Sequence, residues 1–480
     1  MIIQQQIKKI VFALAIIASL SFQVFCQEGQ KQRLIVLTDL DYFEPDDAQS
    51  LVRLLLYSNQ LDIEGLIATG NAENADDLYP DYIRKIIGEY DKIQANLLKH
   101  EDGFPTGKEL LNVVKVGIPL YGMEGVGEGK DSEGSDWIIA KLEEKDERPL
   151  WINVWGGSNT LAQTLWKIKK TESEKEAKRL ISKLRIYAIS DQDDSGAWIR
   201  KNFPDLFYIV SPGRYQDGTW VGMMSVIPGL KNDVVSNFWF AENVQQAHGS
   251  LGAIYPNVVF GVEGDTPSFL YLINNGLNSP EHPDWGSWGG RYEYYTPDND
   301  TTVEWRIPIV QETRPIWTNA EDTYTPTVEA PYGMSIVNDT TTITGDKVTV
   351  SRWREEFQND FAARMDWCVK EYEEANHPPD VEMVTPKEIT VKSREIFQLD
   401  GTKCSDPDGD GLIYYWFNYQ EAGSCKEPAR LFPPNSAKVR AMAPKVDETE
   451  TVHFILKVTD RGTPRLTRYA RVIVTVEPAK

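Results

Sequence analysis

The stretch LIVLTDLDYFEPDD, residues 34–47, joins a run of four apolar residues to a loop with five carboxylates in nine positions. A run that is apolar on both faces is typical of a central strand in a parallel sheet, which helices cover on both sides. Residues 46–57 then place Leu51, Leu54 and Leu55 on one side, as in an amphipathic helix. The stretch therefore predicts a strand, an acidic loop and a helix, in that order.

The same alternation continues along the chain. Further strands are expected at 63–69, 151–155, 184–189 and 206–210, with a helix from Asn159. A helix over 351–376 would close this part before His377-Pro378-Pro379. We therefore expect the α/β fold class, a mainly parallel sheet with helices on both faces and a ligand site at the carboxyl ends of its strands.

The last hundred residues have a different pattern. Short alternating segments between turn residues predict an antiparallel β-sandwich of immunoglobulin type; they cover residues 388–391, 395–399, 412–417, 451–458 and 469–476. The expected division is an α/β domain over 27–378 and a sandwich domain over 379–480. Asp406, Asp408 and Asp410 are compatible with a structural calcium site or with a tight acidic turn, and both interpretations stay open.

Residues 1–26 have the order of a signal peptide. Lys8 and Lys9 precede the apolar run 10–20, and Val24 and Cys26 stand at the −3 and −1 positions of a cleavage site. The run is too short for a membrane span, so no transmembrane segment is expected. We expect a secreted or periplasmic protein; a lipid anchor at Cys26 is the alternative, which Phe25 disfavours.

The charge balance limits the partners. The 480 residues include 50 Lys plus Arg and 72 Asp plus Glu, a net charge of −22 that becomes −24 when the two leader lysines are removed. Such a surface repels phosphate backbones, so nucleic acid is not an expected partner. After export, Cys404 and Cys425 are a plausible disulfide pair and Cys368 a buried free thiol. A homo-oligomer is left open.

The acidic loop at 39–47 is the strongest sign of chemistry. Carboxylates at this density repel one another unless a cation lies among them. Oxygen ligands without His or Cys favour Ca²⁺. The alternative is a solvated turn in which Asp46 and Asp47 cap the helix, but capping explains only one or two of the acids.

Two more acidic loops are expected at the same edge of the sheet. The segment GVEGDTP, residues 261–267, follows an apolar segment at 258–260 that reads as a strand, and Asp265 would close the metal site. The segment DQDDSG, residues 191–196, either lines a substrate site or caps the next helix.

These segments resemble a known family. TDLDYFEPDD resembles the D-T-D-x-G-x-D-D loop of nucleoside hydrolases, LIATGN at 66–71 their T-x-x-G-N segment, and WGGSNTLA at 155–162 their T-G-P-L-T-N-L-A turn. EGDTPSFLYLI at 263–273 and WGSWGGRYE at 285–293 are similar to bacterial nucleoside-hydrolase-like proteins called cellulose-binding, which end in a small β domain.

The resemblance implies the roles of several residues. It implies calcium held by Asp41, Asp47, Asp265 and the main-chain carbonyl of Trp155, with Asp41 as the base that activates a water. The loop has one extra residue, so Asp39 and Asp41 could exchange these roles. Asp46 and Asn71 would bind sugar hydroxyls.

One departure from the family pattern bears on the leaving group. Gly264 stands where many nucleoside hydrolases have a His that protonates the departing base. Glu263 or Glu242 would have to supply a proton instead. The aromatic loop at 285–292, with Trp285 and Trp288, is either a carbohydrate platform or a packing surface against the β domain.

Together these features predict an exported calcium-dependent hydrolase that cleaves an N- or O-glycosidic bond of a sugar conjugate, with a nucleoside or a wall carbohydrate as partner. The alternative from another class is a non-catalytic protein that binds cellulose or another wall polysaccharide on the same fold.

Overall fold

The computed structural model describes residues 30–298, 309–329, 336–338 and 341–479. An eight-stranded sheet lies at its centre, in the order β3-β2-β1-β4-β5-β6-β8-β7. Neighbouring strands are parallel except for the antiparallel edge strand β7. The strands are β1 (Gln32–Thr38), β2 (Leu61–Ala68), β3 (Val114–Val116), β4 (Leu150–Val154), β5 (Leu184–Ala188), β6 (Phe207–Val210), β7 (Tyr292–Tyr295) and β8 (Ile316–Asn319).

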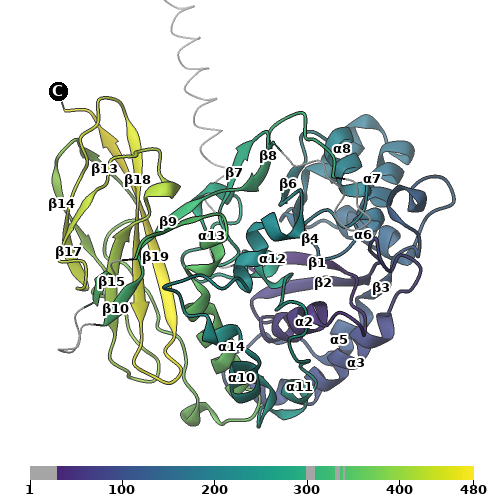
Figure 1. The fold of residues 1–480 in the computed structure, drawn as a ribbon, viewed down its shortest axis with the longest axis horizontal. Coiled ribbons are helices and arrows are strands. Elements are labelled where there is room, and N and C mark those ends of the chain that lie inside the picture. Colours follow the sequence, from purple (N-terminus) through teal and green to yellow (C-terminus); the bar gives the residue numbers. More distant parts are fainter. Residues whose placement is uncertain (1–29, 299–308, 330–335, 339–340, 480) are drawn as a thin grey trace, which may run out of the picture.

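Helices cover both faces of this sheet (Figure 1). The side chains of Leu34 and Val36 belong to one apolar core, while those of Ile35 and Leu37 belong to the other. The strand β1 is therefore buried on both faces, as its sequence predicts. The first core contains α2 (Asp46–Leu56), α3 (Pro80–Asp91), α12 (Thr266–Leu270) and α14 (Arg354–Asp366); the second contains α6 (Glu133–Glu143), α7 (Asn159–Thr171), α8 (Glu174–Ser182) and α9 (Ser195–Asn202).

Shorter elements complete this part of the chain. They are the helices α4 (Gln94–Leu97), α5 (Gly107–Asn112), α10 (Asn237–Phe240), α11 (Gly249–Ala253) and α13 (Val348–Ser351), and the strand pairs β9 (Asp322–Tyr324) with β12 (Ile343–Gly345) and β10 (Thr327–Glu329) with β11 (Ile336–Asn338). Within the described residues, no helix has the length and apolar character needed to cross a membrane. The leader expected at 1–26 lies outside these residues.

Two expected elements are wrong in detail. Residues 258–260 form no strand, because Val259 and Phe260 are 62% and 64% exposed and no neighbouring strand pairs with them. The helix expected over 351–376 is broken into α13 and α14 and ends ten residues early. The apolar period continues beyond Asp366, but the chain folds back there and the Trp367 indole donates to the Asn376 carbonyl at 3.0 Å.

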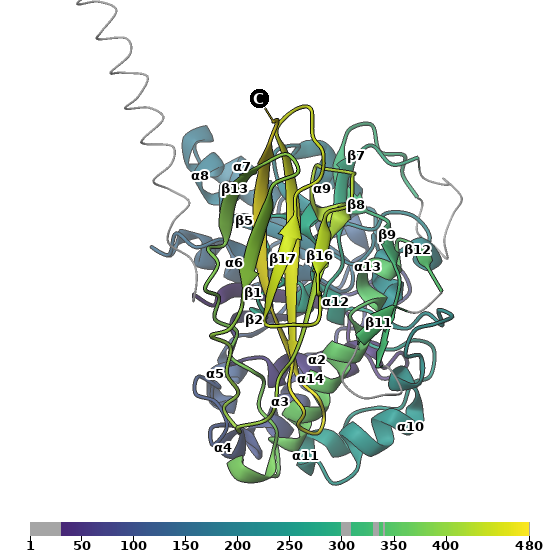
Figure 2. The same ribbon diagram turned by 90° about the vertical axis from the view of Figure 1, so that its left-hand side faces the viewer.

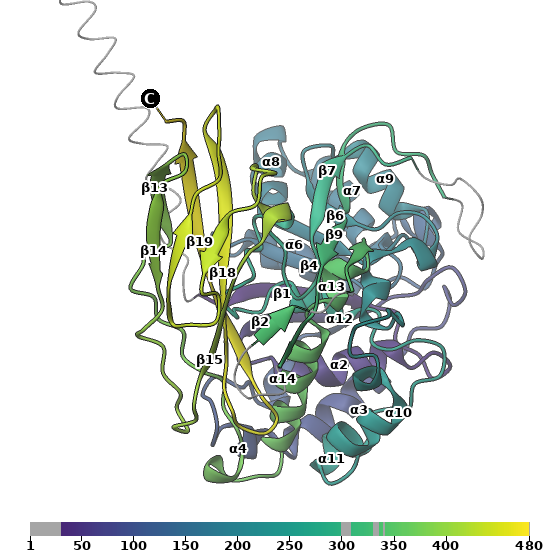
Figure 3. The same ribbon diagram turned by 60° about the vertical axis from the view of Figure 1, so that its left-hand side comes forward.

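The C-terminal residues form the expected sandwich, which lies along one side of the α/β part (Figures 2 and 3). Its two sheets have the orders β13-β19-β18-β15 and β14-β17-β16. All pairs are antiparallel except β13 with β19. The strands are β13 (Glu388–Lys392), β14 (Ile396–Asp400), β15 (Ile413–Asn418), β16 (Arg430–Phe432), β17 (Lys438–Met442), β18 (Glu450–Thr459) and β19 (Thr467–Glu477).

The expected disulfide is wrong, because Cys404 and Cys425 are both free. Cys404 lies near Tyr414, which pairs with Val458 of β18. Cys425 instead donates its backbone N–H to Thr451 at the other end of β18, at 3.1 Å. A strand rises roughly 3.3 Å per residue, so this separation is far beyond the reach of a disulfide. Cys368 is a buried free thiol, as expected.

Candidate metal centre at the carboxyl edge of the sheet

Three carboxylates from two distant segments meet at the carboxyl edge of the sheet. Asp46 and Asp47 begin α2, and Asp265 immediately precedes α12. One oxygen of each carboxylate lies within 4.8 Å of the others, and all three side chains are buried. Because the two helices start at the same edge, the fold brings together acids that are more than two hundred positions apart in the sequence.

Asp39, the first residue after β1, is a fourth acid beside this group and is partly buried. Its Oδ2 accepts a hydrogen bond from Nδ2 of Asn71, while its Oδ1 is buried without a partner. Oδ2 of Asp265 is also buried without a partner. The Asp39 carboxylate packs against Gly156, where a Cβ atom would come within 2.5 Å of it. Glycine at this position is what allows the carboxylate to fit.

The four acids destabilise one another's charged forms. Burial raises the pKa of Asp39 to about 7, and Asp46 and Asp41 add to the rise. Burial raises the pKa of Asp47 and Asp265 well above the usual range, and neighbouring carboxylates raise both further. Among the described residues no Lys, Arg or His forms an ion pair with these four acids. A cation in the centre would remove this unfavourable energy.

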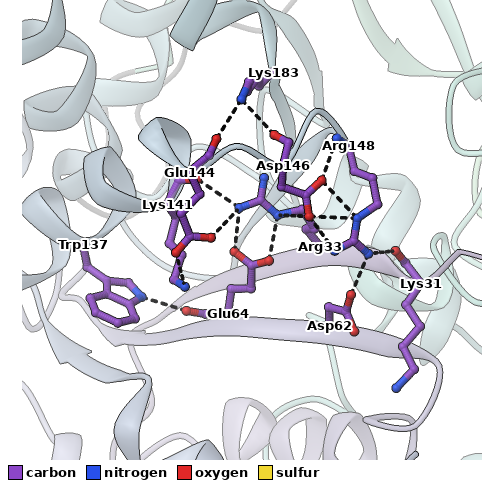
Figure 4. Close-up of polar contacts among 10 residues, drawn as sticks. All are labelled: Lys31, Arg33, Asp62, Glu64, Trp137, Lys141, Glu144, Asp146, Arg148 and Lys183. Carbon is purple, nitrogen blue, oxygen red and sulfur yellow. Dashed lines mark hydrogen bonds and ion pairs between the residues drawn. The ribbon is translucent and has the colours of Figure 1, made fainter.

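The opposite edge of the sheet shows how this chain neutralises acids that have a structural role (Figure 4). Arg33, fully buried, contacts Glu64 at 2.7 Å, and Arg148 contacts Asp62 and Asp146 at 2.6 and 2.7 Å. A shallow depression of about 840 Å³ lies here, lined by Gln30, Lys31, Asp62, Glu144, Lys145, Asp146, Glu147 and Arg148. Its carboxylates are paired with arginines and lysines, so it is less suited to a cation than the carboxyl edge.

The residues at the carboxyl edge fit a hard divalent ion. Carboxylate oxygens are the ligands that Ca²⁺ prefers, and two of the four acids offer an oxygen without a partner. Asp39, Asp46, Asp47 and Asp265 would hold the ion. The carbonyl of Trp155 accepts a hydrogen bond from Nε2 of Gln192, so it would become a ligand only if Gln192 moved.

Asp41 occupies a different position from the one expected for the base. Its Oδ1 accepts the backbone N–H groups of Phe43 and Glu44, each at 2.7 Å. The extra loop residue turns Asp41 outward, where it caps its own loop and stays partly exposed. Its expected place among the buried acids is taken by Asp39. The expectation for Asp41 is therefore corrected in favour of the exchanged arrangement.

Two residues expected to contact substrate are already engaged. Glu263 is fully buried; its Oε1 accepts from the Tyr255 hydroxyl at 2.6 Å, and its Oε2 pairs with Arg53 at 2.7 Å. It therefore holds the loop that presents Asp265, and it is not a free acid. Asn71 donates to Asp39, and its Oδ1 accepts two backbone N–H groups of its own loop. Asn71 orients Asp39.

The position that holds His in many nucleoside hydrolases has no room for a side chain here. A Cβ atom on Gly264 would come within 2.9 Å of both Oδ2 of Asp46 and the ring of Trp220. The Trp220 ring thus fills the space beside the acids. Trp220 is buried, as the sequence suggests, but its place beside these acids is not readable from the sequence, because only the folded chain brings residues 220 and 264 together.

The predicted aromatic platform at 285–292 is a packing surface. Trp288 is fully buried, and its indole N–H donates to the Tyr469 hydroxyl of β19 at 3.3 Å. Trp285 stacks on His282 and meets His453 of β18 edge-on. The sandwich therefore covers Trp288, which cannot reach a carbohydrate, while Trp285 packs against the sandwich and stays partly exposed.

Comparison with known proteins gives matches over both parts of the chain. The family model "Cellulose-binding Sde182, nucleoside hydrolase-like domain" matches residues 33–292, and "Cellulose-binding protein Sde0182, C-terminal domain" matches residues 396–476. Among solved structures, a nucleoside hydrolase-related hypothetical protein from Saccharophagus degradans, described as associated with carbohydrate metabolism, is 33% identical, with a TM-score of 0.78 over 93% of this chain and 100% of that chain.

A second match is confined to a small part of the chain. The PKD domain from KIAA 1837 protein is 24% identical over 22% of this chain and 91% of that chain, with a TM-score of 0.17. No curated protein matches the sequence.

Proposed function

Because this chain belongs to the family of cellulose-binding proteins with a nucleoside hydrolase-like domain, we propose that it is an exported, calcium-dependent hydrolase of a glycosyl bond. The observation that carries the proposal is the group of three buried carboxylates, Asp46, Asp47 and Asp265, with the buried Oδ1 of Asp39 beside them and no cationic partner among the described residues. Burying such a group is costly unless a cation compensates the charges. A group of acids kept at this energetic cost favours a functional role.

Each residue of the centre has a proposed task. Bound calcium would lower the pKa of a coordinated water and so supply a nucleophile near neutral pH. Asp39 would accept a proton from that water through its unpartnered Oδ1, and Asn71 holds the other oxygen in place. Asp47 and Asp265 would hold the ion. Asp46, whose Oδ2 lies next to Gly264, would bind a sugar hydroxyl.

The filled space beside Gly264 bears on how the leaving group is protonated. A purine leaves well only when a nearby acid protonates it. Gly264 supplies no acid, and Trp220 leaves no room for one. A departing sugar hydroxyl needs a proton as well, so the filled space does not separate the two classes of substrate. We favour an O-glycoside of a wall carbohydrate over a purine nucleoside because the matching family models carry the name cellulose-binding.

A non-catalytic carbohydrate-binding protein is the second candidate. The matching family models carry the name cellulose-binding, and Glu263, one of the expected acids, is engaged in structure. In this case the ion would order the loops around a bound sugar without turnover.

Turnover measurements separate the two candidates. Nucleosides and wall oligosaccharides are incubated with the full-length protein in the presence of calcium or of a chelator. The hydrolase proposal expects calcium-dependent release of sugar that Asp39→Asn abolishes and that the exposed variant Asp81→Asn leaves unchanged. Calcium-dependent binding of sugar without release would favour the second candidate. Turnover that survives both chelation and Asp39→Asn would exclude the proposed centre.

A further inference from the structure

Five aromatic side chains border the metal centre on the outside of the protein. Tyr42, Phe43 and Phe260 are 66%, 76% and 64% exposed, and Tyr79 and Tyr82 lie next to Tyr42. We call these five residues the aromatic rim. Tyr42 and Phe43 directly follow Asp41 in the acidic loop, and Phe260 precedes Asp265 by five positions. Three of the five rings thus stand on the same two loops that carry the acids, while Tyr79 and Tyr82 lie at the start of α3.

The rings of the rim form two ordered groups. Tyr42 stacks on Tyr82 with centroids 4.3 Å apart and an angle of 7°, and it meets Tyr79 edge-on at 5.6 Å. Phe43 contacts Phe260 at 5.5 Å with an angle of 31°. Because Tyr42 and Phe43 are consecutive, the two groups adjoin and extend from the start of α3 to the loop before α12.

The loop that presents the rim is held by its own hydrogen bonds. Asp41 accepts the N–H groups of Phe43 and Glu44, each at 2.7 Å, so the loop tip is fixed while its rings stay in solvent. Leaving a Phe ring exposed forgoes roughly 2 kcal/mol of burial. Neighbouring exposed apolar side chains that no other part of the described chain covers are typical of a binding surface.

The charge of the protein narrows the choice of ligand. A net charge of −22 and the acids beside the rim disfavour nucleic acids and acidic polysaccharides. A pyranose ring has an apolar face for an aromatic ring and hydroxyls for carboxylates. A nucleoside offers a single base to stack and would use one of the two groups of rings. A neutral glycan of several residues would use both.

We propose that the aromatic rim binds a neutral polysaccharide chain, with successive pyranose rings on the Tyr42–Tyr82 and Phe43–Phe260 groups beside the metal centre. This deepens the proposed function and rests on it for the place where a bond is cleaved. Binding itself depends only on the rim. The ligand is therefore a chain of sugars, and its affinity rises with the number of rings.

Calorimetry on the full-length protein with calcium tests this. The probes are glucose, cellotriose and cellohexaose, with xylohexaose and mannohexaose as other neutral chains. At least one hexasaccharide is expected to bind. Cellohexaose, if it binds, should bind more tightly than cellotriose and glucose. Tyr42→Ala and Phe43→Ala should each weaken it about tenfold, the effect of losing one good stacking contact. Phe43→Trp should retain binding. Tyr294→Ala is the control, since Tyr294 is 56% exposed on the edge strand β7.

The outcomes separate the rim from the hydrolase. The rim proposal is supported if the rim variants lose hexasaccharide binding while their circular dichroism and their calcium affinity stay unchanged. This holds even if the protein shows no turnover. The rim proposal is overturned if no hexasaccharide binds, if Tyr294→Ala weakens binding as much as Phe43→Ala, or if glucose binds as tightly as cellohexaose. Sedimentation that shows self-association lost in Phe43→Ala would assign the rim to a second copy and also overturn it.

Discussion

Asp39 accepts a hydrogen bond from the side-chain amide of Asn71 through one oxygen, while its other oxygen is buried without a partner. An ordinary structural aspartate would satisfy both oxygens, as Asp322 does with Arg291 and Arg352. The amide holds the carboxylate in place and so fixes the position of the free oxygen, which lies against Gly156. Asp39 is therefore the residue from which the chemistry of the centre is best tested.

The first prediction concerns calcium affinity. Asp39→Asn removes one charged ligand, and we expect calcium binding measured by calorimetry to weaken by at least about tenfold. Asp41→Asn changes a carboxylate that caps its own loop and should weaken it less than about twofold. The reverse order of effects would restore Asp41 to the role that the family pattern implies.

The central strand and the cluster of acids at its end could be predicted from the sequence, because a buried strand shows as a run of apolar residues. Residues 34–37 are apolar on both faces, and acids follow the strand end where parallel sheets bind ligands. The exchange of Asp39 and Asp41 was not decidable, since one inserted residue changes which side chain turns inward.

Other features depend on contacts between distant residues. Trp288 lies among glycines in the sequence, which suggests a ligand platform, but in the structure it packs against Tyr469 of β19. Glu263 reads as a candidate acid until Arg53 and Tyr255 are seen to hold it. Local sequence does not show these partners. The structural roles of Trp288 and Glu263 are therefore visible only in the folded chain.

The second prediction is that calcium stabilises the protein. A ligand that binds only the folded state at about 100 times its dissociation constant adds about 2.7 kcal/mol to the free energy of unfolding. We expect a higher Tm with calcium in thermal denaturation, and no such rise for Asp47→Asn. An equal rise in Tm for this variant would place the ion elsewhere in the protein.

The third prediction is a pH dependence at the contact between α14 and β19. Burial alone would raise the pKa of Asp360, but Arg468 at 2.6 Å and Arg364 at 3.2 Å outweigh it and hold the pKa at about 2. A depressed pKa adds stability above the unfolded value, near 3.9, and this stability is lost as the pH falls toward 2.

Asp360→Asn should therefore lower the free energy of unfolding at pH 7 by about 2 kcal/mol and reduce its slope between about pH 4 and 2. Urea denaturation at several pH values measures this. Asp81→Asn is the control: the Asp81 side chain is 93% exposed and pairs only with Arg84 in the next turn, so a change under about 0.5 kcal/mol is expected. An unchanged slope in Asp360→Asn would contradict the argument.

The fourth prediction separates packing from binding. Trp288→Ala should destabilise the protein by about 3–5 kcal/mol, since it leaves a cavity between α14 and the sandwich. Hexasaccharide binding per folded molecule should stay unchanged. Phe43→Ala should show the opposite pattern, with weaker binding and nearly unchanged stability. If Trp288→Ala abolished binding while the protein stayed folded, the carbohydrate platform at 285–292 would be restored.

The fifth prediction concerns Gly264, where the neighbouring side chains leave no room for a Cβ atom. Gly264→Ala places a Cβ atom 2.9 Å from Oδ2 of Asp46 and 2.9 Å from the buried Trp220 ring, so one of them must move. The ring is enclosed and the carboxylate is a short side chain, so we expect Asp46 to shift and calcium affinity to fall by about tenfold.

Gly261→Ala in the same loop is the matched control, because its Cβ would meet only the flexible end of Met224 at 3.3 Å. Adding Trp220→Ala to Gly264→Ala opens the space again and should restore much of the calcium affinity, a coupling that a double-mutant cycle measures directly. Independent effects of the two changes would mean that Trp220 does not confine Asp46. In that case the glycine at position 264 would not be explained by crowding between Asp46 and Trp220.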